Sequence, residues 1–176
     1  MSDFYFIVGA SKPSRGISKI ASALCMLGDQ CDYSHIHIEF PAGTFQEASV
    51  FFEARRGEVN FINETTFGNE METVRRYVVP CDQDQIHDAL MFCWKYCGIK
   101  YGFLELAGAC VAKAASYCGK TIKNPFGDKM KTEICSGLAA RLIKLSGVEI
   151  IGDIESKSPH DIINICETAG FARVEV

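Results

Sequence analysis

The stretch KTEICSGLAARLIKLSG, residues 131–147, places a cysteine at the front of a segment with helical periodicity. We predict a helix that ends at Gly147, because glycine often follows the last turn of a helix. Its core face is expected to carry Ile134, Leu138, Leu142 and Leu145. Cys135 would then lie beside unpaired N–H groups and the positive end of the helix dipole, which favour the nucleophilic thiolate. The alternative is a buried structural cysteine, which we assume for the other eight cysteines.

A thiol that acts as a nucleophile needs a base, and the chain has four histidines. We expect His87 and His160, which fall on predicted helices, to be exposed to solvent. His35 and His37 alternate with isoleucines in DYSHIHIEF (32–40), so they share one face of a predicted strand. Two histidines on one face indicate a polar site where one of them takes the thiol proton. The alternative is a half-exposed sheet face that carries two incidental histidines.

Glu53 is the candidate for the group that orients the imidazole. It lies between apolar neighbours in SVFFEARRG (49–57), where an unpaired buried carboxylate would be destabilising by roughly several kcal/mol. A hydrogen bond from a histidine N–H would offset that cost. The alternative is a glutamate at a strand end that pairs with Arg55 or Arg56 in solvent.

The predicted strands lie mostly in the first half of the chain. They cover FYFIVGAS (4–11), DYSHIHIEF (32–40), SVFFEARRG (49–57), EVNFI (58–62), TVRRYVVP (73–80) and FARVEV (171–176). We expect a turn at Gly57 and expect Pro80 to end the strand that precedes it. The segment GASKPSRG (9–16) lacks the Gly-Lys-Ser/Thr ending of a phosphate-binding loop, so we interpret it as a turn.

The predicted helices dominate the second half of the chain. Beside the helix that carries Cys135, they cover GISKIASALCMLGD (16–29), DQDQIHDALMFCWKYCG (82–98), LELAGACVAKAASYCG (104–119) and SPHDIINICETAG (158–170). In the last of these, Ser158 is the expected N-cap, Pro159 the first helical residue and Asp161 the residue that reaches back to the cap. Strands first and helices later indicate an α+β fold, which we expect to be one domain over residues 1–176.

Composition excludes several classes of protein. A net charge of −4 gives no basic surface of the kind that binds nucleic acid. No run approaches the roughly 18 apolar residues of a membrane span. The N-terminus MSDFYFIVGA lacks a basic region before an apolar core, so we expect no secretion signal. Nine cysteines without an export signal then favour a reducing cytoplasm over a disulfide framework.

Cys93 and Cys97 are spaced as two ligands on one helix could be. Both fall on the apolar stripe that also contains Ile86 and Leu90, and no second close pair of ligands is evident. We therefore predict neither a metal site nor a cofactor.

Taken in order, these motifs resemble the permuted NlpC-type, papain-like hydrolases of the YiiX/YaeF group. The resemblance rests on YSHIHIEF, FFEARRGEV, KYGF, ICSGLAARLIKLSG and the closing KSPHDIINICETAGF. In that family a Ser-His strand carries the catalytic histidine, a strand ending in Glu-Ala follows, and a tyrosine precedes a helix that begins Cys-Ser. In ordinary NlpC enzymes the cysteine comes first, whereas here His35 precedes Cys135 by 100 residues.

The resemblance implies a papain-like fold with a small antiparallel sheet or partial barrel packed against helices. It implies that Cys135 is the nucleophile, His35 the general base and Glu53 the third member of a triad. His37 stands where the family pattern usually has glycine. The alignment favours His35 as the base, although strand alternation leaves both histidines on one face. The residues expected to contact substrate are Tyr101, His37 and Ser136.

The expected reaction is attack by the Cys135 thiolate on an amide or ester carbonyl, giving an acyl-enzyme that is hydrolysed or passed to an acceptor. Candidate substrates are a peptide, a γ-glutamyl amide or an acyl lipid. A recycled fragment, a cytoplasmic peptide or a phage-associated role is compatible with a chain that lacks an export signal. The alternatives are a binding module that keeps the papain-like shell without turnover and a structural phage or accessory protein.

Overall fold

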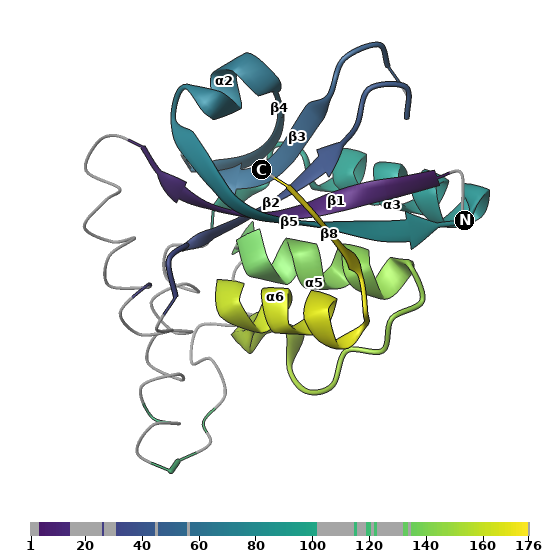
Figure 1. Ribbon diagram of the computed structural model, residues 1–176. Helices are drawn as coiled ribbons and strands as arrows, with labels where there is room; N and C mark the ends of the chain where they lie inside the picture. The colour runs from purple at the N-terminus through teal and green to yellow at the C-terminus, as the bar shows by residue number, and fades with distance from the viewer. Residues whose placement is uncertain are drawn as a thin grey trace.

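Eight strands form one curled sheet in the part of the chain that the structure describes (Figure 1). This structure is a computed structural model that describes residues 4–14, 26, 31–44, 46–55, 57–101, 115, 119–120, 122, 132–133 and 135–175. The strand order is β7-β6-β4-β3-β2-β1-β5-β8, and every neighbouring pair is antiparallel except β6 and β7. The helices predicted over 16–29 and 104–119 fall almost wholly outside the described residues, as does Ile134.

The strands are β1 (Phe4–Pro13), β2 (His35–Phe40), β3 (Val50–Arg55), β4 (Glu58–Asn63), β5 (Met71–Cys81), β6 (Lys100–Tyr101), β7 (Thr132–Glu133) and β8 (Ala172–Val174). The helices are α2 (Glu64–Gly68), α3 (Gln83–Tyr96), α5 (Cys135–Leu145) and α6 (Pro159–Thr168), with a short 3-10 helix, η1 (Ile154–Ser156). The predicted α+β class is confirmed, because an antiparallel sheet built largely from the first half of the chain packs against helices from the second half.

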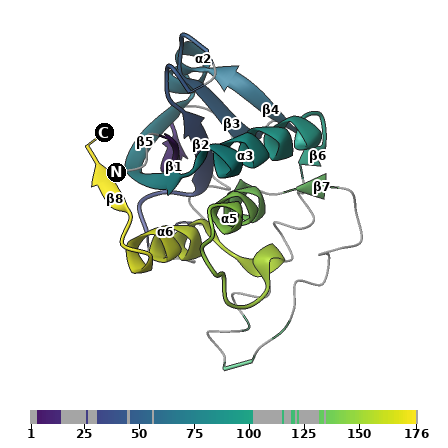
Figure 2. The ribbon, with the colours of Figure 1, turned by 90° about the vertical axis from the view of Figure 1, so that its right-hand side faces the viewer.

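Different helices pack against the two faces of the sheet. Helices α5 and α6 lie on one side and α2 lies on the other (Figure 1, Figure 2). The side of α5 and α6 holds the main core, where Ile36 of β2 and Phe52 of β3 meet Leu138 of α5. The side of α2 holds a smaller cluster of Phe51, Phe67 and Met71. Both faces of β2 are therefore buried, and a half-exposed face at its histidines is excluded.

The helix ends follow the expected local chemistry. In α6, Ser158 caps the N-terminus, Pro159 occupies the first turn and the Asp161 carboxylate returns to the Ser158 N–H, as predicted. Gly147 follows α5 with a φ of 90°, a backbone conformation that favours glycine. The core face of α5 differs from its prediction, since Leu145 is 37% exposed. The fully buried Ile143 fills the core near that end of the helix instead.

Two strands run further than their local signals predict. β1 continues to Pro13, so the expected turn over 9–16 is wrong up to that residue, because this segment pairs with β5 as far as Met71. β5 also continues through Pro80 to Cys81. Val78 is the last residue of β5 that pairs with β8. At Pro80 the strand therefore has β1 as its paired neighbour, and an edge position tolerates the missing N–H of proline.

Candidate active site

Cys135 is the first residue of α5, and its sulfur lies against the beginning of β2. Helix α5 packs on both β2 and β3. The ladder between these two strands extends only from Ile38 to Phe40 on β2, so the earlier residues of β2 are not paired with β3. At this opening the backbone N–H groups of Ile36 and Ser136 donate to the Cys135 sulfur. The start of the helix thus meets the sheet where main-chain donors are available.

His35 is the first residue of β2 and bonds to two partners. Its Nε2 lies 2.9 Å from Oε2 of Glu53 on β3. A second side-chain hydrogen bond joins the imidazole to the Cys135 thiol. Because Nε2 is engaged by Glu53, Nδ1 is the ring nitrogen left for the sulfur. The structure therefore brings together the three residues Cys135, His35 and Glu53 in that order.

Burial is nearly complete at this group, with exposed fractions of 5% for Cys135, 7% for His35 and 4% for Glu53. Burial disfavours the charged imidazole, but the adjacent Cys135 thiolate and the Glu53 carboxylate together raise the pKa of His35 to about 10. Burial also disfavours the thiolate, yet the His35 charge and the surrounding hydrogen bonds hold the pKa of Cys135 below its ordinary value. These opposite shifts favour a thiolate–imidazolium pair, which is the reactive state of a cysteine nucleophile.

The remaining core cysteines behave differently. Burial raises the pKa of the thiols at Cys81, Cys93, Cys97 and Cys166, which keeps them protonated. Cys93 lies in the main core, and Cys97 caps the end of α3. Cys135 is thus distinguished from these four by its partners, because burial acts in the same direction on all five.

His37 lies on β2 two residues after His35 and is 1% exposed. Its ring packs against Phe67 and Phe51, with centroid distances of 4.4 and 5.4 Å. Its Nδ1 lies 3.3 Å from the Ser11 hydroxyl. Gly9 pairs with His37 across β1 and β2, and a Cβ at Gly9 would lie 2.0 Å from Nε2 of His37. The structure places this residue in an aromatic enclosure, while the side-chain hydrogen bond of Cys135 is made with His35.

Gly9 and Ser11 were missed as neighbours of the two histidines. Ser11 is fully buried and pairs directly with His35 in the β1–β2 register. A usable signal was present, because an isolated glycine inside a strand often marks a close approach by another group. Gly9 and Ser11 fall inside the predicted strand 4–11, but the overlapping segment 9–16 is also interpreted as a turn, so no contact with the histidines is predicted for them.

The other two predicted contact residues, Ser136 and Tyr101, belong to elements near Cys135. Ser136 is buried in the first turn of α5 and donates its N–H to the Cys135 sulfur. Tyr101 is half-buried at the end of β6 and pairs with Glu133, two residues before Cys135. The backbone thus brings Tyr101 near the start of α5.

The two remaining histidines differ from each other. His87 is exposed on α3, as predicted. The prediction that His160 is exposed is wrong, because it is half-buried and its Nδ1 lies 3.1 Å from the Tyr33 hydroxyl. Position in the first helical turn indicated exposure, but the α6 N-terminus packs against the segment that leads into β2.

Comparison of the sequence with protein-family models and with curated proteins finds no match. Within the described part of the chain, the helices are too short or too polar to cross a membrane. In that same part, His, Cys, Asp and Glu side chains do not gather in groups of three suited to a metal ion.

Proposed function

We propose that the protein is a cysteine hydrolase with a permuted, papain-like NlpC-type fold. The observation that carries the proposal is the hydrogen-bonded series Cys135–His35–Glu53, which begins at the first residue of a helix. The elements also occur in the permuted order, with a histidine strand, then a glutamate strand, then a cysteine helix. Packing of α5 on β2 and β3 supports the papain-like assignment.

The first half of the proposed reaction forms a thioester. The Cys135 thiolate bonds to the carbonyl carbon of an amide or ester, and the carbonyl electrons move to its oxygen. Backbone N–H groups of the first turn of α5, which have no partner within the helix, stabilise that oxyanion. The carbon–leaving group bond then breaks, and the His35 imidazolium gives its proton to the departing amine or alcohol.

The second half restores the enzyme. Neutral His35 takes a proton from water as the oxygen attacks the thioester, and the Cys135 thiolate leaves as a carboxylic acid is released. Glu53 holds the imidazole orientation throughout and stabilises its charge. An acceptor amine or alcohol in place of water would make the same site a transferase.

The chemistry of the site fits an acyl donor, either a peptide or γ-glutamyl amide or an acyl ester. A serviceable panel contains peptidyl and γ-glutamyl p-nitroanilides together with p-nitrophenyl esters of short and long acids. Hydrolysis of at least one class by the wild type, and its loss in Cys135→Ala, is the expected result. Cys97→Ala is the matched control, because Cys97 is half-buried and distant in sequence from the triad.

Selective alkylation gives an independent test. Iodoacetamide at neutral pH should modify Cys135 ahead of the other cysteines, as measured by peptide mass mapping, and His35→Ala should slow that labelling. Labelling that is scattered over the other thiols would refute the proposal. Selective labelling without hydrolysis of any panel member would favour a binding module that keeps the site without turnover.

A further inference from the structure

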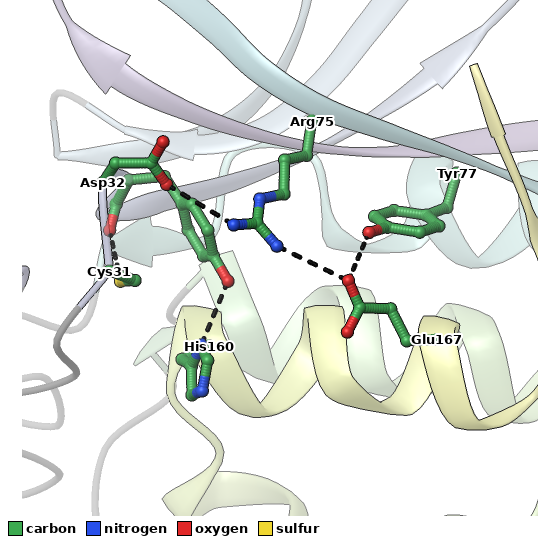
Figure 3. Close-up of polar contacts among 7 residues, drawn as sticks. Cys31, Asp32, Arg75, Tyr77, His160 and Glu167 are labelled. Carbon is green, nitrogen blue, oxygen red and sulfur yellow. Dashed lines mark hydrogen bonds and ion pairs between the residues drawn. The ribbon is translucent and has the colours of Figure 1, made fainter. Parts of the chain in front are cut away.

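A second polar cluster ties the entrance of β2 to β5 and α6 (Figure 3). It consists of Cys31, Asp32, Tyr33, Arg75, Tyr77, His160 and Glu167. Resting on the proposed function, we propose that Tyr33 is a positioning residue that holds the His35 end of β2 against the Cys135 sulfur. This role goes beyond the triad, because Tyr33 acts through the backbone and does not touch the reacting atoms.

Tyr33 is 0% exposed and is held at its ring, hydroxyl and backbone. Its hydroxyl lies 3.1 Å from Nδ1 of His160, in the first turn of α6. The guanidinium carbon of Arg75, on β5, lies 5.3 Å from the centre of the Tyr33 ring. The backbone carbonyl of Tyr33 accepts a hydrogen bond from the Cys31 thiol at 3.0 Å. Burial raises the pKa of the Tyr33 phenol, which therefore keeps its proton and can donate to His160. The segment before β2 thus contacts both α6, through His160, and β5, through Arg75.

The Arg75 side of the cluster is itself braced. Its guanidinium nitrogens lie 3.4 Å from Glu167 of α6 and 3.9 Å from Asp32. Figure 3 shows these two partners on opposite sides of the guanidinium. The Tyr77 hydroxyl donates to the same Glu167 carboxylate at 2.6 Å. Arg75 is therefore fixed over the Tyr33 ring by acidic partners from both α6 and the β2 entrance.

This anchoring matters because the ladder at the front of β2 is one-sided. His35 pairs with Ser11 of β1, but pairing with β3 begins only at Ile38. The next contact toward the N-terminus is the Ser34 N–H, which donates to the Ser11 carbonyl at 3.1 Å and again involves β1. Tyr33, one residue earlier, brings in α6 and β5. Without that hold, the end of β2 can move away from β1 and carry the imidazole out of reach of the sulfur or of Glu53.

The test compares two single-hydroxyl deletions in one cluster. Tyr33→Phe removes the bond between the β2 entrance and His160. Tyr77→Phe removes a bond to Glu167 that reaches the entrance only indirectly, through Arg75. The rate of Cys135 alkylation by iodoacetamide is measured by peptide mapping from pH 5 to pH 10. A misplacement of about 1 Å in a catalytic group can lower a rate by about a hundredfold. For Tyr33→Phe, which removes one of several holds on this segment, we expect a smaller fall of about tenfold in the rate at neutral pH. We also expect the midpoint of the pH profile to move upward, because a displaced imidazolium no longer stabilises the thiolate.

The control Tyr77→Phe should keep the wild-type midpoint even if its melting temperature falls. Far-UV circular dichroism and thermal melting establish that each variant is folded. If Tyr33→Phe does not fold, His160→Phe removes the same hydrogen bond from the other partner and should produce the same shift.

A folded Tyr33→Phe with the wild-type rate and midpoint would overturn the inference, as would equal shifts in Tyr33→Phe and Tyr77→Phe. Both outcomes leave the proposed hydrolase intact, provided that the wild-type Cys135 is alkylated selectively. If the wild-type Cys135 reacts no faster than Cys97, the proposed function fails and the positioning role fails with it.

Discussion

His35 and His37 lie two residues apart on one face of one strand, yet their surroundings have little in common. Both are buried, with exposed fractions of 7% and 1%. His35 is hydrogen-bonded to the Glu53 carboxylate and to the Cys135 sulfur. His37 is enclosed by two phenylalanine rings and contacts the Ser11 hydroxyl. His35 thus has a carboxylate and a sulfur as partners, while the His37 ring is packed among aromatic side chains.

The contrast arises from the place of each histidine along β2. His35 stands at the end of the strand, where the ladder with β3 has stopped and the start of α5 arrives. His37 lies further in, opposite Gly9 and beneath Phe67 of α2. On the proposed function, the reactive position is the point where the N-terminus of α5 meets the end of β2 that is not paired with β3.

The largest expected effect comes from removing the imidazole at the strand end. His35→Ala should lower hydrolysis of the best panel substrate by about a thousandfold or more, since members of such a catalytic unit act together. It should also slow Cys135 alkylation at neutral pH by about tenfold or more, because an unassisted cysteine is mostly protonated there. Stopped-flow or plate-reader rates and peptide mapping give the two values.

The matched variant is His37→Phe, which keeps an aromatic ring between Phe51 and Phe67. Alkylation does not require substrate binding, so its rate at Cys135 should stay at the wild-type value in this variant. Equal slowing of alkylation by His35→Ala and His37→Phe would mean that the two histidines act as one site, which would contradict the contrast drawn between them.

The next effect concerns pH. The thiolate–imidazolium pair exists between the lowered pKa of Cys135 and the raised pKa of His35, about 10. The rate of hydrolysis should therefore rise with pH at values below the ordinary pKa of cysteine. It should fall again only as the pH approaches 10. Glu53→Gln removes a charge that raises the pKa of His35, so the alkaline limb should move to lower pH. An unmoved alkaline limb in Glu53→Gln, read from kcat/KM profiles, would show that the limb belongs to another group.

Local sequence patterns predicted the α+β class, the strand face that carries the two histidines and the position of Cys135 at a helix start. The choice of His35 as the partner of Cys135 was implied by the family resemblance. The local patterns could not separate His35 from His37, since alternation places both on one face and the difference lies in where the β3 ladder ends. The extension of β1 from Ser11 to Pro13 was missed because pairing with β5 outweighs the local turn composition. Leu145 fits the helical period but lies in the last turn of α5, where the helix leaves the core.

A smaller effect is expected at Gly9, which makes room for His37. In Gly9→Ala the new Cβ would lie 2.0 Å from Nε2, so the ring must shift. Overpacking of this kind is destabilising by about 1–3 kcal/mol, measurable in urea unfolding. The same substitution in a His37→Ala background should be nearly free of that penalty, because the clashing ring is gone. An equal cost in both backgrounds would place the origin of the strain elsewhere in β1.

The smallest expected effect is at Ser11, which lies between the two histidines. It pairs with His35 in the β-ladder, but its hydroxyl lies 3.3 Å from Nδ1 of His37. Ser11→Ala should lower the free energy of unfolding by about 1 kcal/mol, the net value of a typical hydrogen bond. The midpoint of the Cys135 alkylation profile should not move, because the lost contact belongs to the enclosed ring. A shifted midpoint would mean that the two regions communicate through this hydroxyl, and His37 would then have to be counted among the groups that tune the thiolate.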